Sequence, residues 1–435
     1  MTILFPLITN ALLIAAMALA LGSPFIKPRS IRVALAFGTF VLALLPLAEL
    51  SLAQYLAGIF GNLSVTSIVL LGLYLAQRCE IFSLPESLSA DLPRLYFIVG
   101  ISAVVLYPTA LGLTNIDLYA AGYYPVILAP LMLSIISLSL WKHWHFLASI
   151  FGLVFLAYGL NVFESDNLWD YFMDPLLSIF CLVQFSKVLP DLIRGLNKST
   201  LEPAALSFAG SFLLFAIPLS IINHDAFRYT LVAEDGFTES STAVALFLVA
   251  IICVRRILRL RHSRSLIFLG MTGFIGLVGF FGAGEEISWG QRIFGWGTPE
   301  FFMEHNKQEE TGLHNLMLEV NGERVNLNKV IFGTGLAIVM SIYLFIMTPL
   351  YRRHKQRNGP FSRFIDSLAI PMPENYHIAG YLIVLACVEL LIDSSKRGEM
   401  TEFAASIIFL LNVAYPHNSE IFSVNQKNNT EKPVS

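Results

Sequence analysis

The chain has 435 residues, of which 55% are hydrophobic and only 14% are charged, and its mean hydropathy is +0.66. A soluble domain carries about 25% charged residues, so this composition excludes an ordinary soluble protein. It predicts an all-α, polytopic bundle of transmembrane helices whose main partner is the lipid bilayer. The formal net charge of −3 argues against nucleic acid as a partner.

Thirteen apolar runs are candidates for helices that cross a hydrocarbon layer of about 30 Å. They cover residues 2–25, 33–55, 60–77, 95–113, 122–141, 145–163, 171–189, 204–223, 239–254, 266–284, 328–350, 376–393 and 402–416. The first run lacks a basic segment before it, so we expect a spanning helix there rather than a signal peptide. We expect three parts: an N-terminal membrane module (1–200, spans 1 to 7), a C-terminal membrane module (201–416, spans 8 to 13) and a disordered cytoplasmic tail (417–435).

Basic residues in short loops predict the orientation of the chain, because such loops remain in the cytoplasm. Arginine and lysine gather in the loops 26–32, 190–203, 255–265 and 351–363. With thirteen spans, all four loops fall on one side. The N-terminus is therefore expected outside and the C-terminus in the cytoplasm.

The opposite, outward side is predicted to be acidic where spans begin or end. Glu239 begins the ninth span, Glu285 and Glu286 follow the tenth, Asp393 ends the twelfth and Glu402 begins the last. A carboxylate at the membrane boundary is costly unless it has a partner or a task. Five such positions at one depth predict a shared polar cavity that opens outward.

The stretch 281–316 holds the densest group of polar side chains. If the tenth helix continued past Gly284, one face would carry Glu285, Ser288, Trp289 and Arg292. Two adjacent carboxylates in a poorly solvated place need a proton, an arginine or a cation. These outcomes correspond to a general acid, an ion pair and a metal site.

Glycines and a proline punctuate the same stretch. Gly290, Gly295 and Gly297 are places where the chain can bend. Thr298-Pro299-Glu300 has the residue order of a helix start, with Thr298 as the cap. Asn321-Gly322 predicts a tight turn between two short segments.

Candidate site residues follow from these patterns. The predicted catalytic residues are Glu285, Glu286, Arg292 and His314. The predicted substrate-binding residues are Trp289, Gln291, Asn306, Gln308 and Asn315. A metal ion would be held by Glu285, Glu286, Glu239 and His314, and such oxygen-rich ligands without thiolates favour Mg, Mn or Ca.

The segments EDGFTE (234–239), GEEISWGQRIFGWGTPE (284–300) and NKQEETGLHN (306–315) resemble those of a family of uncharacterised bacterial multi-pass membrane proteins. The resemblance covers mainly spans 8 to 11. It implies a bacterial inner-membrane location and no established activity. Membrane prenyl-protein proteases use EExxxR, whereas the arginine here comes two residues later.

The leading hypothesis is a metal-assisted hydrolase or transferase that acts on a lipid or lipid-linked substrate. Arg292 would bind an anionic head group, and His314 would serve as a metal ligand or proton shuttle. A transporter or a cation or proton pathway is one alternative. A non-catalytic membrane scaffold with a salt-bridged outer face is the other.

Overall fold

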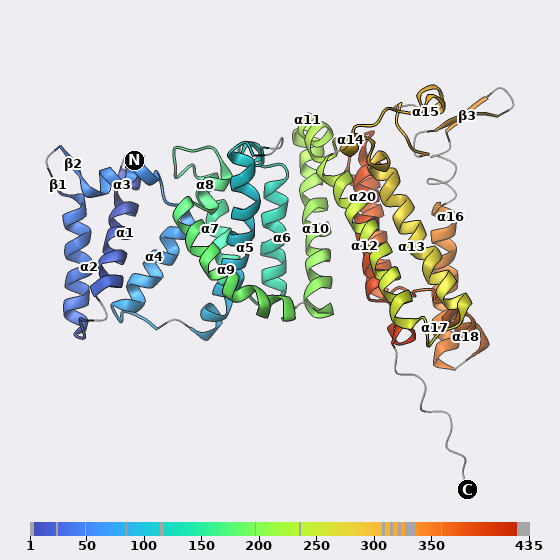
Figure 1. Ribbon diagram of the computed structural model, residues 1–435, viewed down its shortest axis with the longest axis horizontal. Helices are drawn as coiled ribbons and strands as arrows, with labels where there is room; N and C mark the ends of the chain where they lie inside the picture. The colour runs from blue at the N-terminus through green and yellow to red at the C-terminus, as the bar shows by residue number, and fades with distance from the viewer. Residues whose placement is uncertain are drawn as a thin grey trace, which may run out of the picture. The chain divides into compact units, whose positions relative to one another are not determined.

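The computed structural model describes residues 4–22, 25–47, 49–83, 85–113, 117–195, 197–234, 236–306, 309–313, 316–320, 323–326, 336–357 and 359–423. These residues are mostly helical, which confirms the predicted all-α class (Figure 1). The chain divides into two compact units, Met1–Ser211 and Phe212–Ser435. The division falls within helix α10, Lys198–Ile222. The predicted boundary at residue 200 lies near the start of this helix.

Unit 1 consists of helices joined by short connections. Its elements in chain order are α1 Leu4–Gly22, α2 Arg29–Leu44, β1 Pro46–Leu47, β2 Leu50–Ser51, α3 Leu52–Phe60, α4 Val65–Arg78, α5 Glu86–Ala110, the 3-10 turn η1 Ala120–Gly122, α6 Leu128–Trp141, α7 His145–Gly159, α8 Leu168–Phe172, α9 Pro175–Gly195 and the first part of α10. The strands β1 and β2 form a minimal antiparallel pair.

Four helices in the described part of the chain are long and apolar enough to cross a membrane, namely Phe5–Gly22, Leu88–Ala110, Lys198–Ile222 and Leu266–Glu286. Several shorter apolar helices accompany them, including Leu128–Trp141 and Asn375–Leu391. Large apolar side chains also remain exposed along helices such as α10, where Leu214 and Ile222 face outward. The helices thus suit a membrane, while the number of thirteen spans and the orientation stay predictions.

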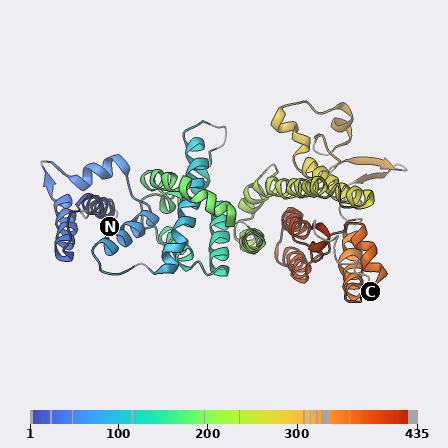
Figure 2. The same ribbon diagram turned by 60° about the horizontal axis from the view of Figure 1, so that its bottom comes forward.

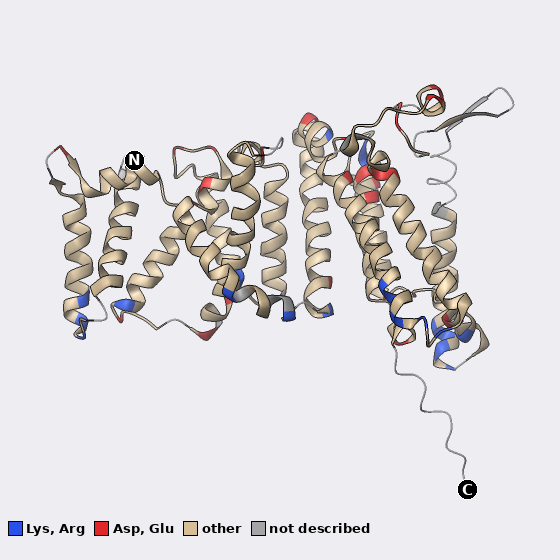
Figure 3. Ribbon diagram, viewed as in Figure 1, with Lys and Arg blue, Asp and Glu red and all other residues tan. Residues whose placement is uncertain are grey.

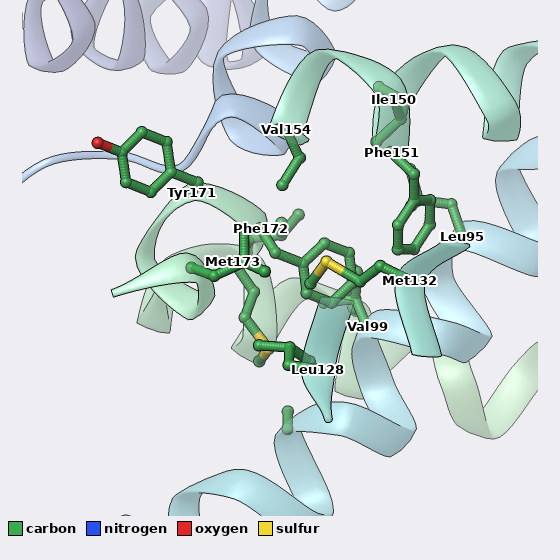
Figure 4. Packing of buried hydrophobic residues seen from close by; sticks show 14 of the residues in the cluster. Leu95, Val99, Leu128, Met132, Ile150, Phe151, Val154, Tyr171, Phe172 and Met173 are labelled. Atoms are coloured by element: carbon green, nitrogen blue, oxygen red, sulfur yellow. The ribbon is translucent and has the colours of Figure 1, made fainter. Parts of the chain in front are cut away.

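The core of unit 1 lies where α5, α6, α7 and α9 meet the short helix α8 (Figure 4). Leu95 and Val99 lie one turn apart on α5 and are fully buried. Phe151 of α7 meets Phe172 of α8 with 5.0 Å between ring centroids. These contacts fix α8 and the start of α9 against the bundle.

A buried carboxylate joins two helix starts in this core. Asp174 precedes α9, is 4% exposed, and accepts a hydrogen bond from the Leu177 amide at 2.9 Å. It also accepts bonds from the Ser64 amide (2.9 Å) and hydroxyl (2.7 Å), and from the Ser67 hydroxyl. One side chain therefore caps α9 and holds the N-cap residue of α4.

Unit 2 begins with the rest of α10 and contains a helical group with an irregular excursion. Its further elements are α11 His224–Ala226, the π-helix η2 Phe227–Leu231, α12 Phe237–Leu260, α13 Leu266–Glu286, the 3-10 turn η3 Ser288–Gly290, α14 Gln291–Phe294, α15 Glu300–His305, β3 Met317–Val320, β4 Glu323–Asn326, α16 Leu336–Ser341, the π-helix η5 Ile342–Met347, α17 Thr348–Gln356, α18 Pro360–Ser367, α19 Asn375–Leu391, α20 Arg397–Ala414 and the 3-10 turn η6 Ser419–Phe422.

Helix α12 is the central packing partner in unit 2, since it contacts both α13 and α20, and α20 in turn contacts α19 (Figure 2). Glycines let α12 and α13 approach closely. A Cβ atom added at Gly276 would lie 2.8 Å from the Cys253 Cβ, and one at Gly279 would lie 2.7 Å from the Leu246 carbonyl oxygen. Small residues at such contacts are typical of helix pairs in membranes. This pairing places the start of α12 beside the end of α13.

The predicted disordered tail is wrong for residues 417–423. They form an ordered segment that includes η6, and the His417 amide donates a hydrogen bond to the Met372 carbonyl. Ile421 and Phe422 are buried against Leu260 and Phe268. Burial of two large apolar side chains outweighs the polar composition of this stretch. Residues 424–435 lie outside the described part of the chain.

Candidate functional site

The end of α13 bends sharply, and the bend organises the stretch 281–316. Helix α13 stops at Glu286, and both Ser288 (φ 47°) and Trp289 (φ 55°) have left-handed backbones. The condition for one helical face from Glu285 to Arg292, a helix that continues unbroken past Gly284, is therefore not met. The chain turns back toward the helix that it has just left, since the Trp289 indole packs on Gly284, where an added Cβ atom would lie 3.0 Å from the ring. Gly290 (φ 77°) and Gly295 (φ 70°) confirm two of the predicted bends.

Glu285 holds this bend together. Its side chain is 9% exposed. One carboxylate oxygen accepts a hydrogen bond from the Trp289 indole N–H at 2.7 Å, and the other accepts one from the Leu313 amide at 2.5 Å. Charge-assisted bonds of this kind are stronger than neutral ones. Glu285 thus ties the segment around residue 313 to the end of α13, which is a positioning role.

Polar side chains beyond Glu285 extend the same network. The Gln291 side chain donates to the Thr298 hydroxyl at 2.6 Å and accepts from the Thr311 amide at 2.8 Å. The Thr298 hydroxyl donates to the Glu309 carbonyl at 2.7 Å. Thr298 is therefore not the cap of α15, whose N-cap is Pro299 without a side-chain bond. The hydroxyl is used in the network instead.

Asn306 closes the excursion at its far end. Its side chain is buried and donates to the Gly312 carbonyl at 3.0 Å, and its backbone forms an isolated bridge with Leu316. The antiparallel strands β3 and β4 follow, with Val320 opposite Glu323. This register agrees with the turn predicted at Asn321-Gly322, and those two residues lie outside the described part. The predicted substrate-binding residues Trp289, Gln291 and Asn306 all serve to shape the segment.

Four glutamates come together where α12 and α20 begin and α13 ends; we call this set the acidic cluster: Glu239, Glu286, Glu399 and Glu402. Figure 3 shows acidic residues gathered at this end of α12, α13 and α20, and basic residues at the opposite ends. The charges of the other three members all act on Glu286, as does that of Glu285. Glu402 is exposed, and the other three side chains are half-buried. The structure therefore brings together carboxylates that lie more than 160 positions apart in the sequence.

Helix dipoles act differently on the members of the acidic cluster. Glu239 and Glu399 lie in the first turns of α12 and α20, where the N-terminal dipole favours negative charge. Glu286 is the last residue of α13, where the dipole opposes it. Among the described residues, Glu286 has no hydrogen bond or ion pair. It is the least stabilised carboxylate of the four.

Two of the described cations, Lys396 and Arg397, lie near the acidic cluster, and each is bound to a residue outside it. The Lys396 ammonium pairs with Glu234 at 3.0 Å, and the Arg397 guanidinium pairs with Glu389 at 2.9 Å. Burial raises the pKa of the Glu399 carboxyl above its ordinary value, while the charge of Lys396 opposes and that of Glu234 adds to this rise. Among the side chains that the structure describes here, the carboxylates Glu234, Glu389 and the acidic cluster therefore outnumber Lys396 and Arg397.

Several predicted site residues lie where the structure says nothing of their side chains. His314, Gln308 and Asn315 are outside the described residues, and Arg292 is described only through the backbone of α14. In the described part, no group of three or more His, Cys, Asp or Glu side chains is arranged to hold a metal ion. The predicted metal set includes His314, so it stays a prediction.

Two residues near the acidic cluster, Glu399 and Glu310, were not among the predicted site residues. Glu399 precedes Glu402 by three positions on α20, and this spacing places both on one helical face. That signal was available. Glu310 accepts a hydrogen bond from the Ser288 hydroxyl at 2.5 Å, and its charge acts on Glu239. The position of Glu310 depends on the bend at residues 287–290, and the only indication of that bend in the sequence is Gly290.

The fold and site define a helical protein with helices suited to a membrane and a carboxylate-rich end in its second unit. No protein-family model, curated protein or solved structure matches the chain.

Proposed function

We propose that this is an integral membrane enzyme, a hydrolase or transferase, whose acidic cluster performs acid–base chemistry on a lipid or lipid-linked substrate. The proposal includes thirteen spans, a bacterial inner-membrane location and an outward-facing acidic cavity. The observation that carries it is Glu286, a half-buried carboxylate without a hydrogen-bond partner among the described residues, surrounded by the charges of Glu239, Glu399 and Glu402. Like charges so close together require bound protons, an arginine or a bound cation.

Glu286 is the candidate acid–base group. It lies at the end of an apolar helix long enough to cross a membrane. In the proposed arrangement this end reaches the depth where a lipid head group meets water. Glu285 and Gln291 hold the following segment in place and leave Glu286 at its edge. Arg292 would bind an anionic head group. His314, with Glu286 and Glu239, would hold Mg, Mn or Ca if the mechanism is metal-assisted.

Transport of a cation or proton is the second candidate, because the same carboxylates could bind either. A pathway would also need polar groups at other depths. Residues 240–254 of α12, 266–284 of α13 and 403–414 of α20 contain no Asp, Glu, Lys, Arg or His. The ionisable groups on these three helices therefore lie at their ends, which favours chemistry at one surface.

The decisive experiment compares wild type, Glu286→Gln and the control Glu300→Gln in vesicles of bacterial polar lipids. Glu300 is an exposed glutamate of α15 outside the acidic cluster. We expect wild type and control to convert a lipid component, measured by mass spectrometry, and Glu286→Gln to lose about 100-fold or more in rate. Adding Mg²⁺, Mn²⁺ or a chelator tests whether the conversion depends on a metal ion.

Three results would contradict the enzymatic proposal. Equal conversion by wild type and Glu286→Gln would remove Glu286 from the chemistry. Proton uptake into the vesicles that depends on Glu286, with no lipid conversion by wild type, would identify a pathway. If wild type shows neither activity and Glu286→Gln fails to fold, the result would support the hypothesis of a non-catalytic membrane scaffold.

A further inference from the structure

An open apolar groove runs along α12 toward the end opposite the acidic cluster. Its volume is ≈ 640 Å³, and Phe280 of α13 forms its other wall. The apolar lining of α12 repeats at intervals of four, three and four residues, at Phe247, Ile251, Val254 and Leu258. This spacing places the four side chains on one helical face. All four, and Phe280, are exposed.

Two arginines form the end of the groove. Arg255 and Arg259 lie one turn apart on the same face of α12, and both are exposed. Neither has a hydrogen bond or an ion pair with any residue that the structure describes. Two guanidinium groups therefore border an apolar surface with no anion supplied by the described chain.

Neighbouring arginines show that this arrangement is specific to two positions. Arg256 is turned inward, where it donates to the Ala414 carbonyl at 3.4 Å and lies over the Phe422 ring at 3.8 Å. Arg264 donates to the Ser423 carbonyl at 3.3 Å and lies over Phe268. The fold uses these two arginines to hold the segment 417–423, whereas Arg255 and Arg259 face outward.

We propose that the groove binds one anionic phospholipid, with an acyl chain along α12 and the phosphate on Arg255 and Arg259. Guanidinium groups suit phosphate because they donate paired hydrogen bonds. From Phe247 to Arg259 the helix rises about 18 Å, close to the roughly 15 Å of hydrocarbon in one leaflet. The lipid belongs to the leaflet at the arginine-rich end, which is predicted to be cytoplasmic. The site depends on membrane location but not on the chemistry of the acidic cluster.

The test uses native mass spectrometry of the full chain released from detergent with added lipid. Palmitoyl-oleoyl phosphatidylglycerol is the anionic probe and palmitoyl-oleoyl phosphatidylcholine the neutral one. We expect wild type to retain phosphatidylglycerol preferentially, and the double variant Arg255→Gln/Arg259→Gln to bind it about 30-fold more weakly. Val254→Trp, which fills the groove at an exposed position, should weaken binding while both arginines remain.

The matched control is Arg353→Gln/Arg357→Gln, which removes another exposed arginine pair of the same spacing from the end of α17, outside this groove. It should bind phosphatidylglycerol like wild type. An equal loss in the control would show a general effect of positive charge, and no loss in Arg255→Gln/Arg259→Gln would refute the site. Competition by glycerol phosphate as effective as by the lipid would identify a site for free phosphate instead. Thermal unfolding of each variant verifies that it is folded.

Discussion

Asp174 in unit 1 and Glu286 in unit 2 are carboxylates in opposite situations. Asp174 is 4% exposed and accepts hydrogen bonds from two amides and two hydroxyls. Glu286 has no hydrogen-bond partner among the described residues and is surrounded by other glutamates. The first charge is compensated by donors that the fold supplies. The second charge receives no such compensation from the side chains that the structure describes.

This difference separates a structural acid from a candidate functional one. Burial alone does not distinguish them, because Asp174 is the more buried of the two. The two carboxylates differ instead in the number of hydrogen-bond donors that the fold supplies to each. Replacing a fully satisfied carboxylate leaves its donors unpaired, whereas neutralising a member of a repelling group relieves repulsion. The two substitutions should therefore change stability in opposite directions.

The largest expected effect is that of Asp174→Ala. It removes the acceptor of four hydrogen bonds and leaves buried donors at Ser64 and Leu177 unpaired. We expect the free energy of unfolding to fall by about 3 kcal/mol or more, measured by thermal unfolding in detergent. Asp166→Ala is the control, since Asp166 is an exposed carboxylate of the same unit. Equal unfolding temperatures for both variants would contradict the structural role of Asp174.

Glu285→Gln should have the next largest effect. Glutamine can still accept the bond from Trp289, but its amide group would then face the Leu313 N–H, donor against donor. Loss of this charge-assisted bond should cost about 2 kcal/mol. The excursion 288–313 should become more sensitive to limited proteolysis, while unit 1 keeps its cleavage pattern. Unchanged cleavage would show that Glu285 does not hold this segment.

Many of the helices and the end of the bundle at which the acids gather could be predicted, because they depend on local sequence patterns. Apolar runs predict helices such as α5, α10 and α13, and the acids at residues 239, 286 and 402 were expected to share one end of the bundle. The bend after Glu286 could not be predicted. It requires left-handed backbones at Ser288 and Trp289, which neither residue favours by itself.

Tertiary contacts, rather than local preferences, account for these misses. The bend is stabilised by Glu285, which bonds to residues four and 28 positions later. The ordered segment 417–423 likewise depends on Leu260 and Phe268, which are distant in sequence. The hydrogen bonds between Asp174 and the start of α4 join positions that are about a hundred residues apart. The sequence alone therefore does not distinguish Asp174 from an acidic residue at the membrane surface.

Glu286→Gln should stabilise the protein, in contrast to Asp174→Ala. Removing one charge from the acidic cluster relieves repulsion from Glu239, Glu399 and Glu402, and we expect a gain of about 1 kcal/mol in alkaline buffer. In acid the gain should vanish as the neighbouring carboxyls take up protons. Thermal unfolding of wild type and variant at both pH values measures this. A loss of stability in alkaline buffer would mean that the Glu286 charge is compensated and that the comparison with Asp174 fails.

The smallest effect concerns Glu399, and its sign follows from proton binding. Burial raises the pKa of this carboxyl in the folded protein above its ordinary value of 4.5. In the window between these two pKa values the folded state holds more protons than the unfolded one, so stability falls as pH rises through it. Glu399→Gln should flatten this part of the curve of unfolding temperature against pH, whereas Glu300→Gln should not. Lys396→Met should steepen it, because the charge of Lys396 opposes the rise in pKa. If Lys396→Met leaves the curve unchanged, the Lys396 ammonium acts only on Glu234. The negative charge of the acidic cluster would then receive no compensation from Lys396.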